Sequence, residues 1–180
     1  MNVSDAIDKR RSVRQYLDEE VDEATMEKIL HAGLRAPSAM NKQQTSFVVC
    51  RNHEVLDEIS KMCVASFPEA LSGYKSRFAD KSIFYNAPIV VFVHADHGCP
   101  GWEIGDSSIS MAQMCLQATE LGIGSCIIGL VTMGSAEAQT KVKELLSIPQ
   151  ENQMVAAVIF GKPKYDGKAP AIKEGRVSFV

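Results

Sequence analysis

The run PIVVFV at residues 88–93 decides the fold class of this chain. It is unbroken by polar residues and has the length of one strand, so it lacks the alternation of a strand that faces water on one side. We therefore expect a central strand, covered on both faces. Three other segments have the composition of strands in the same sheet: TSFVVC at 45–50, CIIGL at 126–130 and MVAAVIF at 154–160.

Helical patterns fill the segments around these strands. Each segment either begins at a residue that commonly caps helices or contains apolar residues at a spacing of three and four. In the helix near residue 60, Val55, Ile59 and Met62 are expected to turn inward, and residues 64–86 are left open as helix, lid or both. We expect helices from Asn2 or Ser4 to Lys9, from Asp22 to Ala36, from Glu54 to Met62, from Asp106 to Leu121, and from Ser135 to about Leu146.

The predicted helix at 106–121 has apolar or small residues on nearly every turn. A helix without a wide polar face is buried on most sides. Part of its surface is therefore a candidate for cover by a second copy of the chain.

Composition favours one globular domain over residues 1–180. The chain is 46% hydrophobic and 23% charged, and it contains no internal repeat or linker. Strands and helices alternate, which predicts a layered sheet with helices. With no apolar leader, no membrane-length apolar run and no basic stripe, we expect a cytoplasmic protein that binds neither membrane nor nucleic acid. Five cysteines without a C-x-x-C pair make disulfides unexpected.

The run RRSVR at residues 10–14 places three guanidiniums and a hydroxyl together in a chain of net charge -3. This is a local anion site rather than part of a basic surface. A helix would pair Arg10 with Arg14, whereas an extended segment would put Arg10, Ser12 and Arg14 on one side. Either geometry suits a phosphate. The alternative is a solvated helix end with cations at its negative pole.

Five motifs, taken in order, resemble the nitroreductase family of flavin enzymes. They are RRSVR at 10–14, APSAMNKQ at 36–43, NAP at 86–88, LGIGSCIIG at 121–129 and GKP at 161–163. The resemblance implies an α+β sandwich with a central mixed sheet flanked by helices, in an intertwined homodimer. It also implies one FMN at each of two subunit interfaces, and ping-pong transfer of hydride or electrons from NAD(P)H to a nitroarene, quinone or enone.

The same resemblance assigns cofactor-binding residues and no catalytic side chain, because the cofactor carries the chemistry. Small residues let backbone approach a flat ring, and amides can bond both kinds of ring edge. The residues assigned to the phosphate are Arg10, Arg11, Ser12, Arg14, Lys173 and Arg176. Those assigned to the ring are Pro37, Ser38, Ala39, Asn41, Gln43, Asn86, Ile127, Ile128 and Gly129.

Two departures leave the substrate open. Gln44-Thr45 stands where the family often has Pro-Trp, and only residues 64–86 are available as a cover over the site. Within that stretch, aromatic residues either line the substrate side or belong to the core: Tyr74, Phe78, Phe84 and Tyr85.

Other functions are less favoured by the sequence. Four potential metal ligands lie at 94–99 without a partner set, and Gly122-x-Gly124 follows a helix rather than a strand, unlike a dinucleotide fingerprint. Apolar neighbours make Cys126 a packing residue instead of a nucleophile. The alternatives that stay open are a flavin-assisted dehalogenase or similar chemistry, and a module that stores FMN without turnover. The choice between NADH and NADPH is open too.

Overall fold

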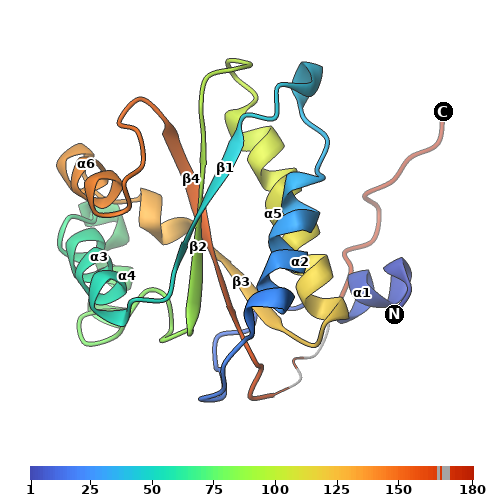
Figure 1. The fold of residues 1–180 in the computed structure, drawn as a ribbon, viewed down its shortest axis with the longest axis horizontal. Helices are drawn as coiled ribbons and strands as arrows, with labels where there is room; N and C mark the ends of the chain where they lie inside the picture. The colour runs from blue at the N-terminus through green and yellow to red at the C-terminus, as the bar shows by residue number, and fades with distance from the viewer. Residues whose placement is uncertain (166, 168–170) are drawn as a thin grey trace.

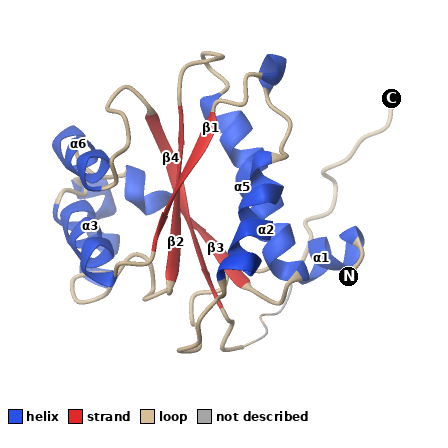
Figure 2. Cartoon of the chain, in the orientation of Figure 1, coloured by secondary structure: helices blue, strands red, loops and turns tan. Residues whose placement is uncertain are grey.

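The structure is a computed structural model that describes residues 1–165, 167 and 171–180. One four-stranded sheet lies between two layers of helices (Figure 1, Figure 2). Its strands are β1 (Thr45–Cys50), β2 (Ile89–Ala95), β3 (Gly124–Ile128) and β4 (Gln153–Gly161), in the order β1-β2-β4-β3. The expected sandwich of helices on a central sheet is confirmed.

The expectation of a mixed sheet is wrong for these four strands, because every neighbouring pair is antiparallel. β2 and β3 do run in the same direction, as a crossover through one helix between them requires. β4 inserts between them and runs the opposite way. The parallel contact that remains among the described residues is the isolated bridge between Ser12 and Ser125.

β2 is the central strand that its sequence predicts, since all seven of its residues are buried. Its side chains alternate between two cores. Val90 and Phe92 belong to the core beneath the helices at 53–77 and 136–145, whereas Val91 and Val93 belong to the core against the helices at 23–34 and 103–120. This two-sided burial fixes the sheet between the layers.

Three helices begin at the caps that the sequence predicts. The caps Asn2, Asp22 and Ser135 each accept a hydrogen bond from a backbone N–H of the first turn. The helices are α1 (Val3–Lys9), α2 (Glu23–Leu34) and α6 (Ala136–Leu145).

Helix α3 (His53–Ala65) is longer than predicted, and its buried face is rotated. Leu56, Ile59 and Cys63 are buried, and Val55 and Met62 are partly buried but pack against the same core, so the predicted inward face is confirmed at Ile59 and lies at the edge of the core at Val55 and Met62. The open stretch after α3 contains a 3-10 turn, η2 (Glu69–Leu71), and the short helix α4 (Ser72–Arg77).

Helix α5 (Glu103–Glu120) begins one turn earlier than predicted, and Gly122 with φ of +73° ends it. Of its 18 residues, 13 are buried or partly buried, so the predicted burial on most sides is confirmed, with the exception of one face. One face is exposed and largely apolar, and it contains Ile104, Ser108, Ile109 and Ala112.

β3 also begins earlier than predicted, at Gly124, and residues Gly129–Thr132 form a 3-10 turn, η3. All five cysteines are free thiols, as expected. Among the described residues, no helix combines the length and the hydropathy needed to cross a bilayer.

Candidate functional site

The segment after α1 is extended, so the second of the two alternatives for RRSVR holds. The backbone N–H of Val13 donates to the Ser125 carbonyl at 2.9 Å, and Ser12 bridges Ser125. Successive side chains therefore alternate. Ser12 and Arg14 are exposed, whereas Val13 is buried against β3.

The exposed side of this segment faces Cys126 of β3. Burial raises the pKa of the Cys126 thiol, while the positive charges of Arg14 and Arg10 lower it. Ser12 acts on the same thiol through a hydrogen bond. Three of the predicted phosphate residues thus lie near the same thiol. Cys126 is 2% exposed, as expected of a packing residue.

Arg11 lies apart from these three. It is half-buried and lines a different pocket of about 490 Å³ together with Gly124 and Tyr165. The alternation of an extended segment explains this, since Arg11 is one position out of phase with Arg10, Ser12 and Arg14.

Tyr85 and Asn86 form a turn beside Arg14. Both have left-handed backbones, with φ of 54° and 53°. The Arg14 guanidinium carbon lies 5.8 Å from the centroid of the Tyr85 ring, which is a cation–π distance. Asn86 lines the same pocket as Arg14, so the structure brings these two predicted residues together.

Ile127 and Ile128 are the last residues of β3, on the side away from the Ser12 bridge, and Gly129 is the first residue of η3. Ile127 is exposed, whereas Ile128 is buried in the core. β3 is an edge strand. Apart from Gly129 and its two chain neighbours, no described residue has an atom within 4 Å of the position where a Cβ of Gly129 would be, so the backbone is open to a ligand there.

The loop at 37–43 is held by hydrogen bonds. The backbone N–H of Ala39 donates to both carboxylate oxygens of Asp106, at 3.1 Å each. The N–H of Gln43 donates to the Ser38 hydroxyl at 2.9 Å, and the Gln43 amide donates to the Asn41 side-chain oxygen at 3.2 Å. Pro37 precedes these residues and is exposed.

This loop and the Arg10–Arg14 segment lie at opposite ends of the sheet (Figure 1). The loop leads into Thr45, which pairs with Ala95, and Ala95 pairs with Gln153. Gly124 instead pairs with Gly161 at the other end of β4. At about 3.3 Å per residue, β4 separates the two ends by roughly 25 Å. One chain therefore does not bring all the predicted residues into one site.

The tail residues Lys173 and Arg176 are exposed. The C-terminal segment extends beyond α1, away from the body of the molecule (Figure 1). Within one chain the structure does not bring these two cations to Arg10 and Arg14.

Sequence reasoning missed Asp106 and Gln44 as positioning residues. Asp106 is 2% exposed, and Gln44 donates to its carboxylate at 2.8 Å while accepting from the N–H of Cys99 at 2.8 Å. A carboxylate within a helix whose other spaced residues predict a buried face is the signal that could have identified Asp106, because a buried charge needs partners.

The four polar residues at 94–99 do not converge on a cation site. His94 accepts from the Asn152 amide at 3.0 Å, and His97 bonds Glu103 at 2.8 Å. Over the described ranges, no group of three or more His, Cys, Asp or Glu side chains is arranged to hold a metal.

The model of the Nitroreductase family matches residues 7–162, and the chain belongs to this family. A protein of Methanothermobacter thermautotrophicus, provisionally named NADH dehydrogenase/NAD(P)H nitroreductase, is 31% identical over 166 residues, which cover 91% of this chain and 78% of that protein. The family membership confirms the resemblance that the five motifs indicate.

Two solved structures share the fold. The nitroreductase with bound FMN from Bacteroides fragilis has a TM-score of 0.87 and 26% identity, covering 100% of this chain and 99% of its own. An FMN-dependent nitroreductase from Clostridium difficile has a TM-score of 0.78 and 29% identity, and the match covers 97% of this chain and 96% of that chain.

Proposed function

We propose that this protein is an FMN-dependent oxidoreductase that takes hydride from NADH or NADPH and reduces a small electrophile. The observation that carries the proposal is the convergence of Arg10, Ser12 and Arg14 on one side of an extended segment, beside an edge strand with open backbone. The family membership supports it.

The phosphate of FMN suits the cations on this segment. A phosphate monoester has a charge of about -2 near neutral pH, and Arg10 and Arg14 supply two guanidiniums next to the Ser12 hydroxyl. A charge-assisted hydrogen bond contributes about 1.5–3 kcal/mol net, so two or three such bonds suffice to retain the mononucleotide.

The ring of FMN suits the space beyond the phosphate. At Gly129 no side chain stands in the way, and the edge of β3 can present backbone N–H groups to an electron-rich ring edge. Asn86 would offer its amide from the turn beside Arg14.

A second copy of the chain would complete the site. The loop with Pro37, Ser38, Ala39, Asn41 and Gln43 lies too far from Arg14 in one chain, so we propose that it reaches the cofactor from the partner of a homodimer. The exposed apolar face of α5 would provide the interface. The extended tail would cross to the partner and bring Lys173 and Arg176 to a phosphate.

The chemistry that FMN supplies when bound is acceptance of a hydride and delivery of the electrons to a nitroarene, quinone or enone. The chain's own residues bind and orient: cations hold the phosphate, backbone groups meet the ring edge, and the 37–43 loop covers one face. Because only the other face would then be open, the two substrates would use it in turn, which is a ping-pong order.

The test begins with the absorption spectrum of the purified protein and identification of the released chromophore. Steady-state oxidation of NADH and NADPH with a quinone acceptor follows, on the same holoprotein. We expect bound FMN and catalytic turnover. Bound FMN without turnover would identify a storage module, and a colourless protein that takes up no FMN would reject the proposal.

A further inference from the structure

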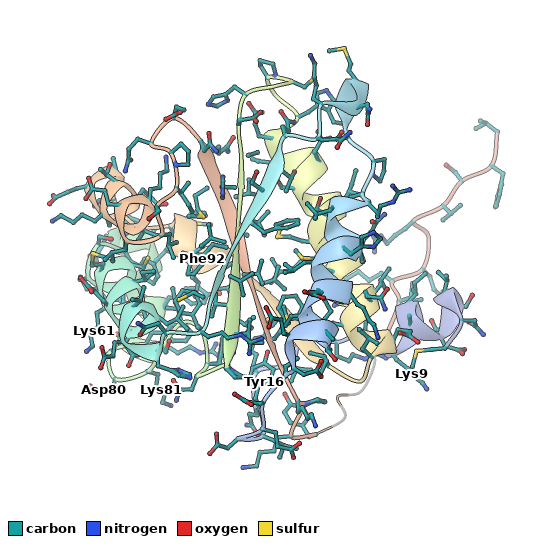
Figure 3. All side chains as sticks on the ribbon, in the orientation of Figure 1. Lys9, Tyr16, Lys61, Asp80, Lys81 and Phe92 are labelled. Atoms are coloured by element: carbon teal, nitrogen blue, oxygen red, sulfur yellow. The ribbon has the colours of Figure 1, made fainter. Side chains whose placement is uncertain are left out.

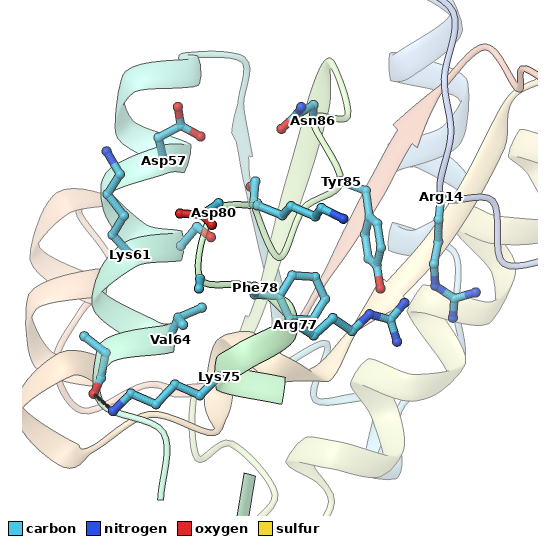
Figure 4. A pocket seen from close by; sticks show the side chains of 15 residues that line it. Arg14, Asp57, Lys61, Val64, Lys75, Arg77, Phe78, Asp80, Tyr85 and Asn86 are labelled. Atoms are coloured by element: carbon cyan, nitrogen blue, oxygen red, sulfur yellow. Dashed lines mark hydrogen bonds between the residues drawn. The ribbon is translucent and has the colours of Figure 1, made fainter. Parts of the chain in front are cut away.

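A pocket of about 860 Å³ opens beside the proposed cofactor site (Figure 4). It lies between α3, α4 and the turn that ends at Asn86. Arg14 and Asn86 line one side of it, so it is continuous with the residues proposed to hold FMN. Its volume is within the range of small-molecule sites.

The pocket is electropositive, although the chain as a whole has a net charge of -3. Five basic and two acidic side chains line it: Arg14, Lys61, Lys75, Arg77, Lys81, Asp57 and Asp80. None of these seven takes part in the four ion pairs found in the described part of the chain. An excess of positive charge around a concave surface attracts an anion into it.

Two of the cations are held against aromatic rings. The Arg77 guanidinium lies 5.4 Å from the centroid of the Phe78 ring, and Arg14 lies 5.8 Å from that of Tyr85. Phe78 and Tyr85 pack edge to face, with centroids 5.6 Å apart. In Figure 4 the Arg77 guanidinium lies at the hydroxyl end of Tyr85, and the Arg14 side chain runs alongside the same ring. The aromatic pair thus fixes two forks of donors before any ligand arrives.

We infer that this pocket is a subsite for the oxidising substrate, and that it selects a planar aromatic acceptor with a carboxylate or sulfonate on its ring. The inference rests on the proposed function and deepens it. Arg14 is already assigned to the FMN phosphate, so Arg77 is the guanidinium left for this ligand. It lies beside the Phe78 and Tyr85 rings, so the ligand's own ring and anionic group must be adjacent. An aromatic carboxylate has this arrangement, whereas the phosphates of a nicotinamide dinucleotide lie several bonds from its rings.

The experiment compares two acceptors of the same shape, anionic 4-nitrobenzoate and neutral 4-nitrobenzamide, on the FMN-loaded protein. The variant Arg77→Gln removes the charge on an exposed side chain, Arg77→Lys keeps it without the planar fork, and Lys28→Gln on α2 is the matched charge control. We expect Arg77→Gln to lower kcat/KM for 4-nitrobenzoate about tenfold, mainly through KM. Values for 4-nitrobenzamide should stay the same, Arg77→Lys should restore part of the loss, and Lys28→Gln should cause none.

Two results would overturn the inference: equal changes for both acceptors in Arg77→Gln, or a rise in KM for the reduced nicotinamide alone, which would assign the cations to the dinucleotide. Calorimetric titration with 4-nitrobenzoate separates this inference from the proposed function. Binding that Arg77→Gln abolishes supports the subsite even if neither acceptor turns over. Turnover without any preference for the anion rejects the subsite and leaves the oxidoreductase.

Discussion

Arg14 belongs to the extended segment, lies over the Tyr85 ring and lines the electropositive pocket. We predict that Arg14→Ala weakens FMN binding at least tenfold, because it removes a charge-assisted bond to the phosphate. The defect should shrink as salt rises, since screening weakens the same attraction in the parent protein. Quenching of FMN fluorescence at two ionic strengths measures both effects.

Arg11→Ala is the matched comparison for that variant. Arg11 is three residues away and lies on the opposite side of the segment, in another pocket. Its removal should change FMN affinity by less than about threefold. An Arg14→Ala protein with parent affinity would reject the phosphate role.

Asp106 is a buried carboxylate that joins α5 to the 37–43 loop. Asp106→Asn keeps its shape but replaces an acceptor oxygen with a donor that faces the donors of Ala39 or Gln44. We expect the free energy of unfolding to fall by about 2 kcal/mol. Urea denaturation measures it, with exposed Asp18→Asn as the control. An unchanged midpoint would show that the loop does not depend on this carboxylate.

His97 gives the protein a pH-dependent contact. Its hydrogen bond to Glu103 raises the pKa of His97 above the usual 6.5, and the same bond lowers the pKa of Glu103 below 4.5. Because the folded pKa of His97 is raised, its contribution is complete below pH 6.5 and disappears as pH rises through the raised value. The Glu103 contribution is present above pH 4.5 and is lost in more acidic solution.

We therefore expect His97→Gln to destabilise the protein most between about pH 5 and 6. The difference from the parent should narrow toward alkaline pH. Unfolding curves at intervals from pH 5 to 9 test this, and a difference that stays constant over the whole range would contradict it.

At the scale of the element, α5 has an exposed face that its own chain does not cover. Ile104 is 59% exposed, and burial of such a side chain contributes about 1.5–3 kcal/mol. Ile104→Asp should place a charge in the proposed interface, shift the protein from a dimer toward the 19.7 kDa single chain, and weaken FMN retention.

Leu145→Asp on α6 is the control for that substitution, because its 39% exposed side chain lies on the far layer of the sandwich. Light scattering after size-exclusion chromatography gives the mass of both variants. A monomeric parent protein would contradict the role given to this face, and so would an Ile104→Asp protein that stays dimeric and retains as much FMN as the parent.

The elements also show which local signals are sufficient. Capping residues predict the starts of three helices correctly, because a cap accepts hydrogen bonds from backbone N–H groups in the first turn. These caps are Asn2, Asp22 and Ser135. The predictions of where α5 begins and of which face of α3 is buried are less accurate, since packing against the sheet decides which turn is the first and which side is buried.

At the scale of the whole molecule, the feature that matters for function is the separation of the predicted cofactor-binding residues into two groups. The cationic segment and the polar loop lie at opposite ends of one sheet. Helix α2 lies between their motifs in the sequence, and its local pattern does not indicate that it leads from one end of the sheet to the other. The separation favours a site shared between two copies of the chain.

The sequence by itself determined the layered class, the central strand, the caps and the family. These depend on local spacing and on side-chain chemistry, which the order of residues contains. Only the tertiary structure decided that β4 lies between β2 and β3, that Arg11 points away from Arg10 and Arg14, and that Arg77 and Tyr85 share a pocket. Such neighbours come from different parts of the chain and meet only because burial of both sheet faces fixes how the layers pack.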